Sequence, residues 1–159
     1  MDINVICIGK LKERYWTDAI AEYSKRLKPY CALTITELKE SRLKANAGPA
    51  EEEEVKVNEG RDIRSHIGPQ DFVITLEIKG KKLTSEKLAE KMADLALEGH
   101  STIDFIIGGS LGLSAEVSGR ADYKLSFSDM TFPHQMMRVI LLEQIYRSYK
   151  IQRGEPYHK

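Results

Sequence analysis

Short apolar segments alternate with longer amphipathic segments along the whole chain. The apolar segments are rich in β-branched residues and end at glycine, proline or polar residues, which predicts strands over residues 3–9, 32–39, 71–80, 102–110 and 122–128. Between them, apolar residues recur at helical spacing, which predicts helices over residues 12–27, 51–67, 84–97, 114–120 and 133–150. Strands that alternate with helices are typical of an α/β fold with a mainly parallel sheet. No linker or internal repeat divides the chain, so we expect residues 1–159 to form one domain.

Ligands of open parallel sheets bind beyond the carboxyl ends of the strands, where the strand order reverses. Three strand ends are therefore candidates for a binding site: residues 76–80, 108–112 and 127–132. The second contains the stretch IIGGSLGLS, whose glycines at 108, 109 and 112 let a ligand approach the backbone closely. Their spacing matches neither a phosphate loop nor a dinucleotide-binding loop, which argues against a generic nucleotide-binding protein. The stretch indicates either a tight turn beside a ligand or a plain turn between a strand and a helix.

The loop after the last predicted strand is unusually apolar, since ordinary loops carry small and polar residues. Apolar and polar residues alternate along it, in the order Phe127, Ser128, Asp129, Met130, Thr131 and Phe132. The apolar side chains could enclose a flat base while backbone groups contact its edge. Thr131 is expected to cap the following helix, with Pro133 as the first helical residue. His134 then lies in the first turn, where a backbone-bonded role is favoured over that of a catalytic base.

The last predicted helix is apolar on nearly every face, with Met136 and Ile140 opposite the side that would cover its own sheet. Such a helix needs cover beyond a single sheet, and a second subunit in a symmetric dimer is the simplest cover. Glu143 and Arg147 stand four residues apart with the acid first, so they can form an ion pair. The pair is either an ordinary surface ion pair or a partly buried one with a role beyond structure.

The final residues, IQRGEPYHK at 151–159, are unusual for a terminus, since termini normally fray. Tyr157 could stack on a base, while Arg153 or Lys159 could contact a phosphate. His158 could move a proton near neutral pH. We therefore treat this tail as a candidate contact with nucleic acid.

Composition adds few constraints. The chain is 42% hydrophobic and 30% charged, with 24 basic and 24 acidic residues, so bulk charge does not identify a partner. Basic residues gather over 10–28 and 138–159, and after folding they could form a basic face for nucleic acid. Charge alone favours the other interpretation, a mixed solvated surface. Cys7 and Cys31 lack metal-binding spacing, which predicts buried free thiols and no metal site. Neither a signal peptide nor a membrane-spanning run is present, so we expect a cytoplasmic protein without a membrane partner.

Three stretches of the sequence resemble the SPOUT superfamily of ribosomal RNA methyltransferases: FIIGGSLGL, LSFSDMTFPHQMMRVILLEQIYRSYKI and the terminal PYHK. Within that superfamily the chain is similar, over its whole length, to the pseudouridine N3-methyltransferases that modify the large-subunit RNA. The resemblance implies a sheet with helices on both faces and a C-terminal trefoil knot over about residues 71–150, followed by the tail. Knots are exceptions to the ordinary rules of chain connection, so the residue pattern alone does not predict one.

The resemblance also implies the cofactor, the partners and the reaction. S-adenosylmethionine would be held by the three knot loops, at Leu76, Gly108, Phe127, Ser128, Asp129, Met130, Thr131 and Phe132. The family acts as a homodimer in which the partner's tail completes each site, and the implied residues here are Glu143, Arg147, Tyr157, His158 and Lys159. The implied reaction is methylation of N3 of a pseudouridine in 23S ribosomal RNA of assembled ribosomes. His158 would either take the proton or hold the base.

Two features leave alternatives open. The family often ends in arginine where this chain has Lys159, and lysine lacks the forked hydrogen-bond geometry of arginine. A non-catalytic, ribosome-associated RNA-binding factor of the same fold is the other reading of the chain. Such a factor should keep its ribosome binding when residues 157–159 are deleted, whereas an enzyme with a composite site should lose methylation.

Overall fold

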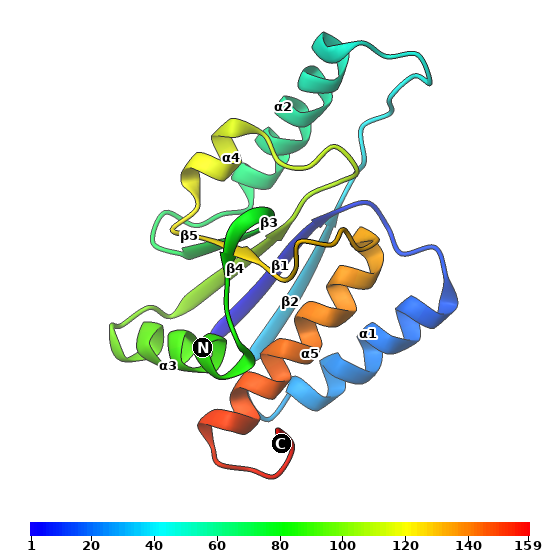
Figure 1. Ribbon diagram of the computed structural model, residues 1–159. Helices are drawn as coiled ribbons and strands as arrows, with labels where there is room; N and C mark the ends of the chain where they lie inside the picture. Colours follow the sequence, from blue (N-terminus) through cyan, green and yellow to red (C-terminus); the bar gives the residue numbers. More distant parts are fainter.

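The computed structural model describes all residues, 1–159, as one parallel sheet flanked by helices (Figure 1). The five strands are β1 (Asp2–Ile8), β2 (Ala32–Leu38), β3 (Phe72–Lys82), β4 (Thr102–Ile107) and β5 (Tyr123–Ser126). The helices are α1 (Arg14–Leu27), α2 (Pro49–Ser65), α3 (Ser85–Leu97), α4 (Ala115–Arg120) and α5 (His134–Gln152). The strand order is β2-β1-β4-β3-β5 and every pairing is parallel. The predicted α/β class is thus confirmed, while the trefoil knot stays a prediction.

Helices cover both faces of the sheet because its strands are apolar on both sides. On β1, Ile3, Val5 and Cys7 point into the larger core, while Ile6 and Ile8 point into the smaller one. The larger core also takes residues of α1, α3 and α5, and the smaller core takes residues of α2 and α4. The same two layers of helices are visible on either side of the sheet in Figure 1. This arrangement places the carboxyl ends of the strands and the start of α5 at one edge of the molecule.

Strand β3 is longer than its apolar pattern predicts. Lys81 and Lys82, which lie beyond the predicted strand over 71–80, continue the strand because they pair with Leu125 and Ser126 of β5 after a shift in register. Gly80 lies at that shift, where an added Cβ would come within 2.7 Å of the backbone oxygen of Lys124. Only glycine allows the two strands to approach each other so closely.

The start of α5 also differs from the prediction. The N-cap is Pro133, in an extended conformation with ψ of 134°, and no side chain caps the helix. The assignment of Thr131 as the cap was therefore wrong, since the helix begins one residue later than expected and Thr131 lies too far upstream. Pro133, predicted as the first helical residue, is instead the N-cap, and His134 begins the helix and so lies in its first turn, as predicted. For α3 the cap is Thr84, whose Oγ1 accepts a hydrogen bond from the Lys87 backbone N–H at 3.1 Å.

Both cysteines are free, with Cys7 buried and Cys31 half-buried. Burial raises the pKa of each thiol to about 11, so both stay protonated and unreactive near neutral pH. No group of three or more His, Cys, Asp or Glu side chains is arranged to hold a metal ion. None of the helices combines the length and the apolar character that crossing a membrane requires.

Asp104 is a fully buried carboxyl in the middle of β4. Asn4 donates a hydrogen bond to its Oδ1 at 2.7 Å, while its Oδ2 has no partner. Burial, and to a smaller extent the neighbouring Asp71, raise the pKa of Asp104 from 3.8 to about 7. Between about pH 4 and pH 7, Asp104 is therefore protonated in the folded state and mostly ionised in the unfolded chain. Stability from this group is present at low pH and is lost as the pH rises through 7.

Replacement of Asp104 by Asn is expected to remove this loss. The amide oxygen keeps the bond from Asn4 and never ionises. From pH 5 to pH 8 the free energy of unfolding of the wild type should fall by about 1 kcal/mol or more relative to that of Asp104→Asn. Urea denaturation of both proteins at the two pH values measures this difference. An equal pH dependence in the two proteins would show that Asp104 does not titrate in this range.

Candidate functional site

A pocket opens where the middle of β3, at residues 76–78, and the carboxyl end of β4 meet the loop between β5 and α5. It encloses about 650 Å³ of space, its open mouth included, which lies within the range of small-molecule and cofactor sites. Its lining comes from three segments and the start of α5: Leu76, Glu77, Ile78, Ile107, Gly108, Gly109, Gly112, Leu125, Phe127, Ser128, Met130, Thr131, Phe132, His134 and Met137. The three strand ends selected from the sequence thus converge on one pocket.

The glycine-rich turn is the tightest part of the pocket wall. An added Cβ at Gly108 would lie 2.9 Å from Cδ2 of Leu113 and 3.1 Å from the backbone oxygen of Gly112. Gly112 itself has a φ of +83°, a conformation that favours glycine. A bridge between Gly109 and Gly112 closes the turn. The stretch is therefore a compact turn whose backbone borders the pocket, rather than a plain connection to α4.

The loop after β5 is held by two serine hydroxyls. Oγ of Ser126 donates to the backbone oxygen of Ser128 at 3.2 Å, and Oγ of Ser128 accepts from the backbone N–H of Met130 at 3.0 Å. These bonds leave Met130 74% exposed at the rim of the pocket. All the residues predicted to bind a cofactor line the pocket except Asp129, whose carboxylate instead pairs with Lys82 on the surface.

Glu77 is the only carboxylate among the lining residues, and although it lies within the candidate segment 76–80, no role was predicted for it. Oγ1 of Thr75 donates to its Oε2 at 2.6 Å, and Oγ of Ser118 donates to its Oε1 at 2.9 Å. These hydroxyls fix a negative charge beside the apolar walls. The available signal was an acidic residue at the end of the apolar run FVITL, directly after Leu76.

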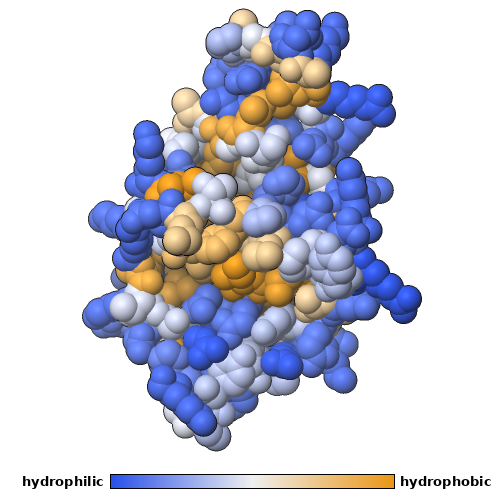
Figure 2. All heavy atoms as spheres, turned by 45° about the vertical axis from the view of Figure 1, so that its right-hand side comes forward, coloured by the Kyte–Doolittle hydropathy of each residue, from blue (hydrophilic) through white to orange (hydrophobic).

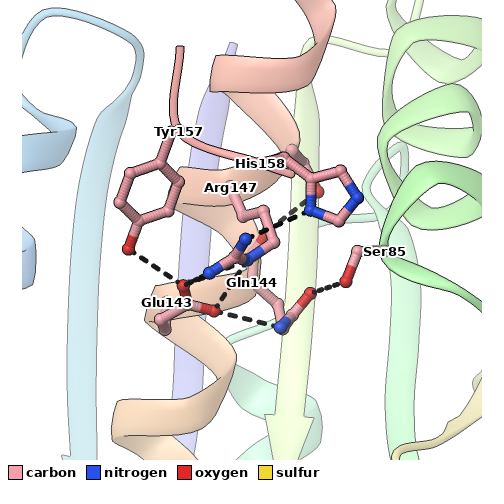
Figure 3. A network of polar contacts seen from close by, with 7 residues as sticks. Ser85, Glu143, Gln144, Arg147, Tyr157 and His158 are labelled. Atoms are coloured by element: carbon pink, nitrogen blue, oxygen red, sulfur yellow. Dashed lines mark hydrogen bonds and ion pairs between the residues drawn. The ribbon is translucent and has the colours of Figure 1, made fainter.

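A second cluster of polar residues lies along the C-terminal half of α5 and the tail (Figure 3). Glu143 accepts hydrogen bonds from Nη2 of Arg147 at 2.7 Å and from the hydroxyl of Tyr157 at 3.0 Å. Nη1 of Arg147 lies 3.1 Å from Nδ1 of His158. The predicted Glu143–Arg147 pair is thus confirmed and is partly buried. Lys159 is exposed and takes no part in this network.

The tail folds back against α5 instead of fraying. Gly154, with a φ of +64°, reverses the chain after the helix. Glu155 then accepts from Nζ of Lys150 at 2.6 Å and from the hydroxyl of Tyr30 at 2.7 Å. Tyr157 packs edge-on against Tyr146, with 5.0 Å between the ring centroids. Burial and the bond to Glu143 raise the pKa of Tyr157, so its hydroxyl stays protonated and donates.

The two clusters are separate within one chain. A helix rises about 1.5 Å per residue, so α5 spans about 9 Å from Met137, the last lining residue, to Glu143 in the network, and about 20 Å from His134 to Arg147. In Figure 1 the tail turns back at the carboxyl end of α5, opposite to the end that follows β5. The structure therefore brings together the residues of each cluster, but a single chain does not join them in one site.

Arg138 connects α5 to the far strands of the sheet. Its side chain is 2% exposed, and Nη2 donates to the backbone oxygens of Ile8 and Gly9, each at 2.8 Å. Nη1 donates to Oε2 of Glu37 at 2.8 Å. Because Arg138 follows Met137, a lining residue, this anchor fixes the start of α5 and with it one wall of the pocket. In the sequence, Arg138 stands out only as one of the basic residues gathered over 138–159.

Comparison with known proteins gives matches over the whole chain. A family model described as "Predicted SPOUT methyltransferase" matches residues 1–158. The Ribosomal RNA large subunit methyltransferase H of Clostridium novyi is 58% identical over 159 residues, which is 100% of both chains. The protein of the same name from Bifidobacterium adolescentis is also 58% identical over 100% of both chains. A protein of Methanococcus maripaludis named Putative ribosomal RNA large subunit methyltransferase H is 54% identical over the same extent.

Proposed function

The chain belongs to the SPOUT methyltransferase family, and from this premise we propose that it methylates large-subunit ribosomal RNA with S-adenosylmethionine as the methyl donor. The finer proposal is that the acceptor is N3 of a pseudouridine in 23S RNA and that the substrate is the assembled ribosome, in the cytoplasm. The observation that carries the proposal is the pocket, in which three strand ends meet over apolar walls. The trefoil knot over about residues 71–150 belongs to the same proposal.

The lining residues fit S-adenosylmethionine in shape and in chemistry. Leu76, Phe127 and Phe132 offer apolar surfaces suited to adenine and to the methionine chain, and the glycine turn lets backbone groups approach the ligand. Glu77 offers a fixed negative charge for a ligand that carries positive ammonium and sulfonium groups. When bound, the cofactor would supply a methyl group on a positively charged sulfur, which activates that methyl toward a ring nitrogen.

The RNA side of the site is proposed to come from the second subunit of a homodimer. Within one chain no residue of the tail cluster lines the pocket, and the nearest members along α5, Met137 and Glu143, are about 9 Å apart. Half-buried apolar side chains of α5, among them Met136, Val139 and Ile140, offer a surface for a partner. Figure 2, which turns the side of α5 and α1 forward, shows an apolar area in the middle of that face between polar surroundings.

The tail cluster would bind and orient the acceptor base. Arg147 keeps donor groups near the ring of Tyr157, with its Cζ 4.7 Å from the ring centroid, so a base could contact guanidinium and aromatic surface together. Lys159, exposed at the end of the chain, would contact a backbone phosphate as a simple charge. Much of the rate would then come from positioning, which can supply on the order of 7–11 kcal/mol in well-oriented reactions.

Replacement of Met130 by Arg is expected to weaken the binding of S-adenosylmethionine by about tenfold or more, a loss of about 1.4 kcal/mol. Met130 lies at the rim of the pocket, where a guanidinium would narrow the mouth and repel the positive sulfonium. Because the side chain is 74% exposed, the substitution leaves the core unchanged. Isothermal titration of both proteins with the cofactor measures the effect.

Leu97→Arg is the matched control, since it makes the same change of charge at an 86% exposed position at the end of α3, away from the pocket. It should bind the cofactor as the wild type does. An unchanged affinity of Met130→Arg would place the cofactor elsewhere. Wild-type protein that binds the cofactor but methylates no ribosomal RNA would favour the non-catalytic, ribosome-associated factor.

A further inference from the structure

Both ring nitrogens of His158 have a partner in the folded tail. Nδ1 lies 3.1 Å from Nη1 of Arg147, and Nε2 lies 2.8 Å from Oε1 of Glu86. His158 is partly buried, whereas Glu86 is largely exposed in the first turn of α3. Neither contact was foreseen from the sequence, because Glu86 is 72 residues away from His158 along the chain.

The chemistry of the two partners determines where the proton of His158 lies. A guanidinium only donates hydrogen bonds, so Nδ1 must accept from Arg147. A carboxylate only accepts, so Nε2 must carry the hydrogen and donate to Glu86. The bond from His158 is also the main reason why the pKa of Glu86 is lowered, which keeps that carboxylate ionised. The contacts therefore define a neutral imidazole with its hydrogen on Nε2.

The same contacts close a ring that begins and ends on neighbouring residues of α3. Oγ of Ser85 donates to Oε1 of Gln144 at 2.7 Å, and Nε2 of Gln144 donates to Oε2 of Glu143 at 3.0 Å. Glu143 accepts from Arg147, which contacts His158, which contacts Glu86. Figure 3 shows Ser85 beside Gln144 and His158 beside Arg147, with Glu143 between Gln144 and Arg147. The start of α3 thus holds both ends of the chain of bonds.

We propose that Glu86 is a positioning residue, which holds His158 as the Nε2–H tautomer and through it orients the guanidinium of Arg147. The proposal rests on the proposed function, in which Arg147 orients the RNA base. A consequence follows for His158 itself. Its Nδ1 lone pair is occupied by Arg147 and its Nε2 carries a hydrogen, so in this arrangement His158 takes no proton from the substrate and serves to orient Arg147.

The test is ¹⁵N NMR of the histidine side chains in the full-length protein, combined with steady-state kinetics on ribosomes. His158→Asn identifies the signals of the ring. The wild type should show a protonated Nε2 and an unprotonated Nδ1. Glu86→Ala should give a mixture of tautomers and lower kcat by about tenfold, with unchanged affinity for S-adenosylmethionine. Glu86→Gln, which keeps an oxygen acceptor, should retain the wild-type tautomer and most of kcat.

Glu90→Gln is the matched control on the same helix, since Glu90 pairs only with Lys87 on the surface. It should change neither the spectrum nor kcat. A wild-type ring protonated on Nδ1, or a Glu86→Ala protein with unchanged tautomer and kcat, would overturn the proposal. Wild-type protein that methylates no ribosomal RNA would overturn the proposed function instead, while the ring signals would still establish or refute the Glu86–His158 assignment.

Discussion

Deletion of Tyr157, His158 and Lys159 is expected to lower the rate of ribosomal RNA methylation by about 100-fold or more, because misplacement of reacting groups by even 1 Å can cost that much. The deletion removes the donor to Glu143 and the partner of Arg147, so the cluster on α5 loses its order. The affinity for S-adenosylmethionine should stay unchanged, since none of these residues lines the pocket. Transfer of a labelled methyl group to ribosomes and isothermal titration measure the two quantities.

Tyr157→Phe is a more conservative change than this deletion, because it removes only the hydroxyl that donates to Glu143 and keeps the ring against Tyr146. It should lower the rate by less than the deletion does. Methylation at the wild-type rate by the deleted protein would show that the tail is not part of the site.

Mixed dimers test directly whether the site is shared between subunits. A chain with Met130→Arg retains its tail, and a chain lacking residues 157–159 retains its pocket. In a dimer of the two, one site has an intact pocket and an intact partner tail. Random mixing should therefore restore about a quarter of the wild-type rate, since half of the dimers are mixed and each has one complete site. No recovery above the two separate proteins would mean that each site uses its own tail.

Replacement of Arg138 by Met is expected to destabilise the fold by about 3 kcal/mol, since loss of one partner of a buried pair typically costs this much or more. The substitution keeps the apolar stem but leaves the backbone oxygens of Ile8 and Gly9 without the guanidinium. It also leaves Glu37, which is partly exposed, without its cation. Urea denaturation followed by circular dichroism measures the change in free energy of unfolding.

Two further variants separate the loss of bonds from the loss of charge. Arg138→Lys keeps a cation but cannot reach all three acceptors with a planar fork, so it should fall between the wild type and Arg138→Met. Arg14→Met removes a guanidinium that is 94% exposed and paired only with Asp18, and it should change stability by about 0.5 kcal/mol or less. A loss below about 1 kcal/mol for Arg138→Met would mean that water replaces the guanidinium at these carbonyls.

The sequence by itself determined the elements and selected several members of each of the two clusters. Apolar periodicity is a local property, so each strand and helix was predicted to within a few residues. The predicted strand over 71–80 ended too early because the last residues of β3 pair with β5 through a register shift. The rule that ligands bind at the carboxyl ends of parallel strands selected the three segments that now line the pocket. The tail was recognised because an aromatic residue, a histidine and a lysine are unusual at a fraying end.

Only the tertiary structure decided which polar residues are buried and which partners they contact. Arg138, Glu77 and Glu86 look like ordinary surface charges in the sequence, because the identity of a polar residue does not reveal whether its side chain is buried or what it contacts. The partner of Arg138 on β2 is 101 residues away, and the partner of His158 on α3 is 72 residues away. Hydrogen bonds depend on distances of about 3 Å between specific atoms, and such distances arise only when distant segments pack together. Periodicity reports the face on which a residue lies, whereas its partner is set by the packing of the whole fold.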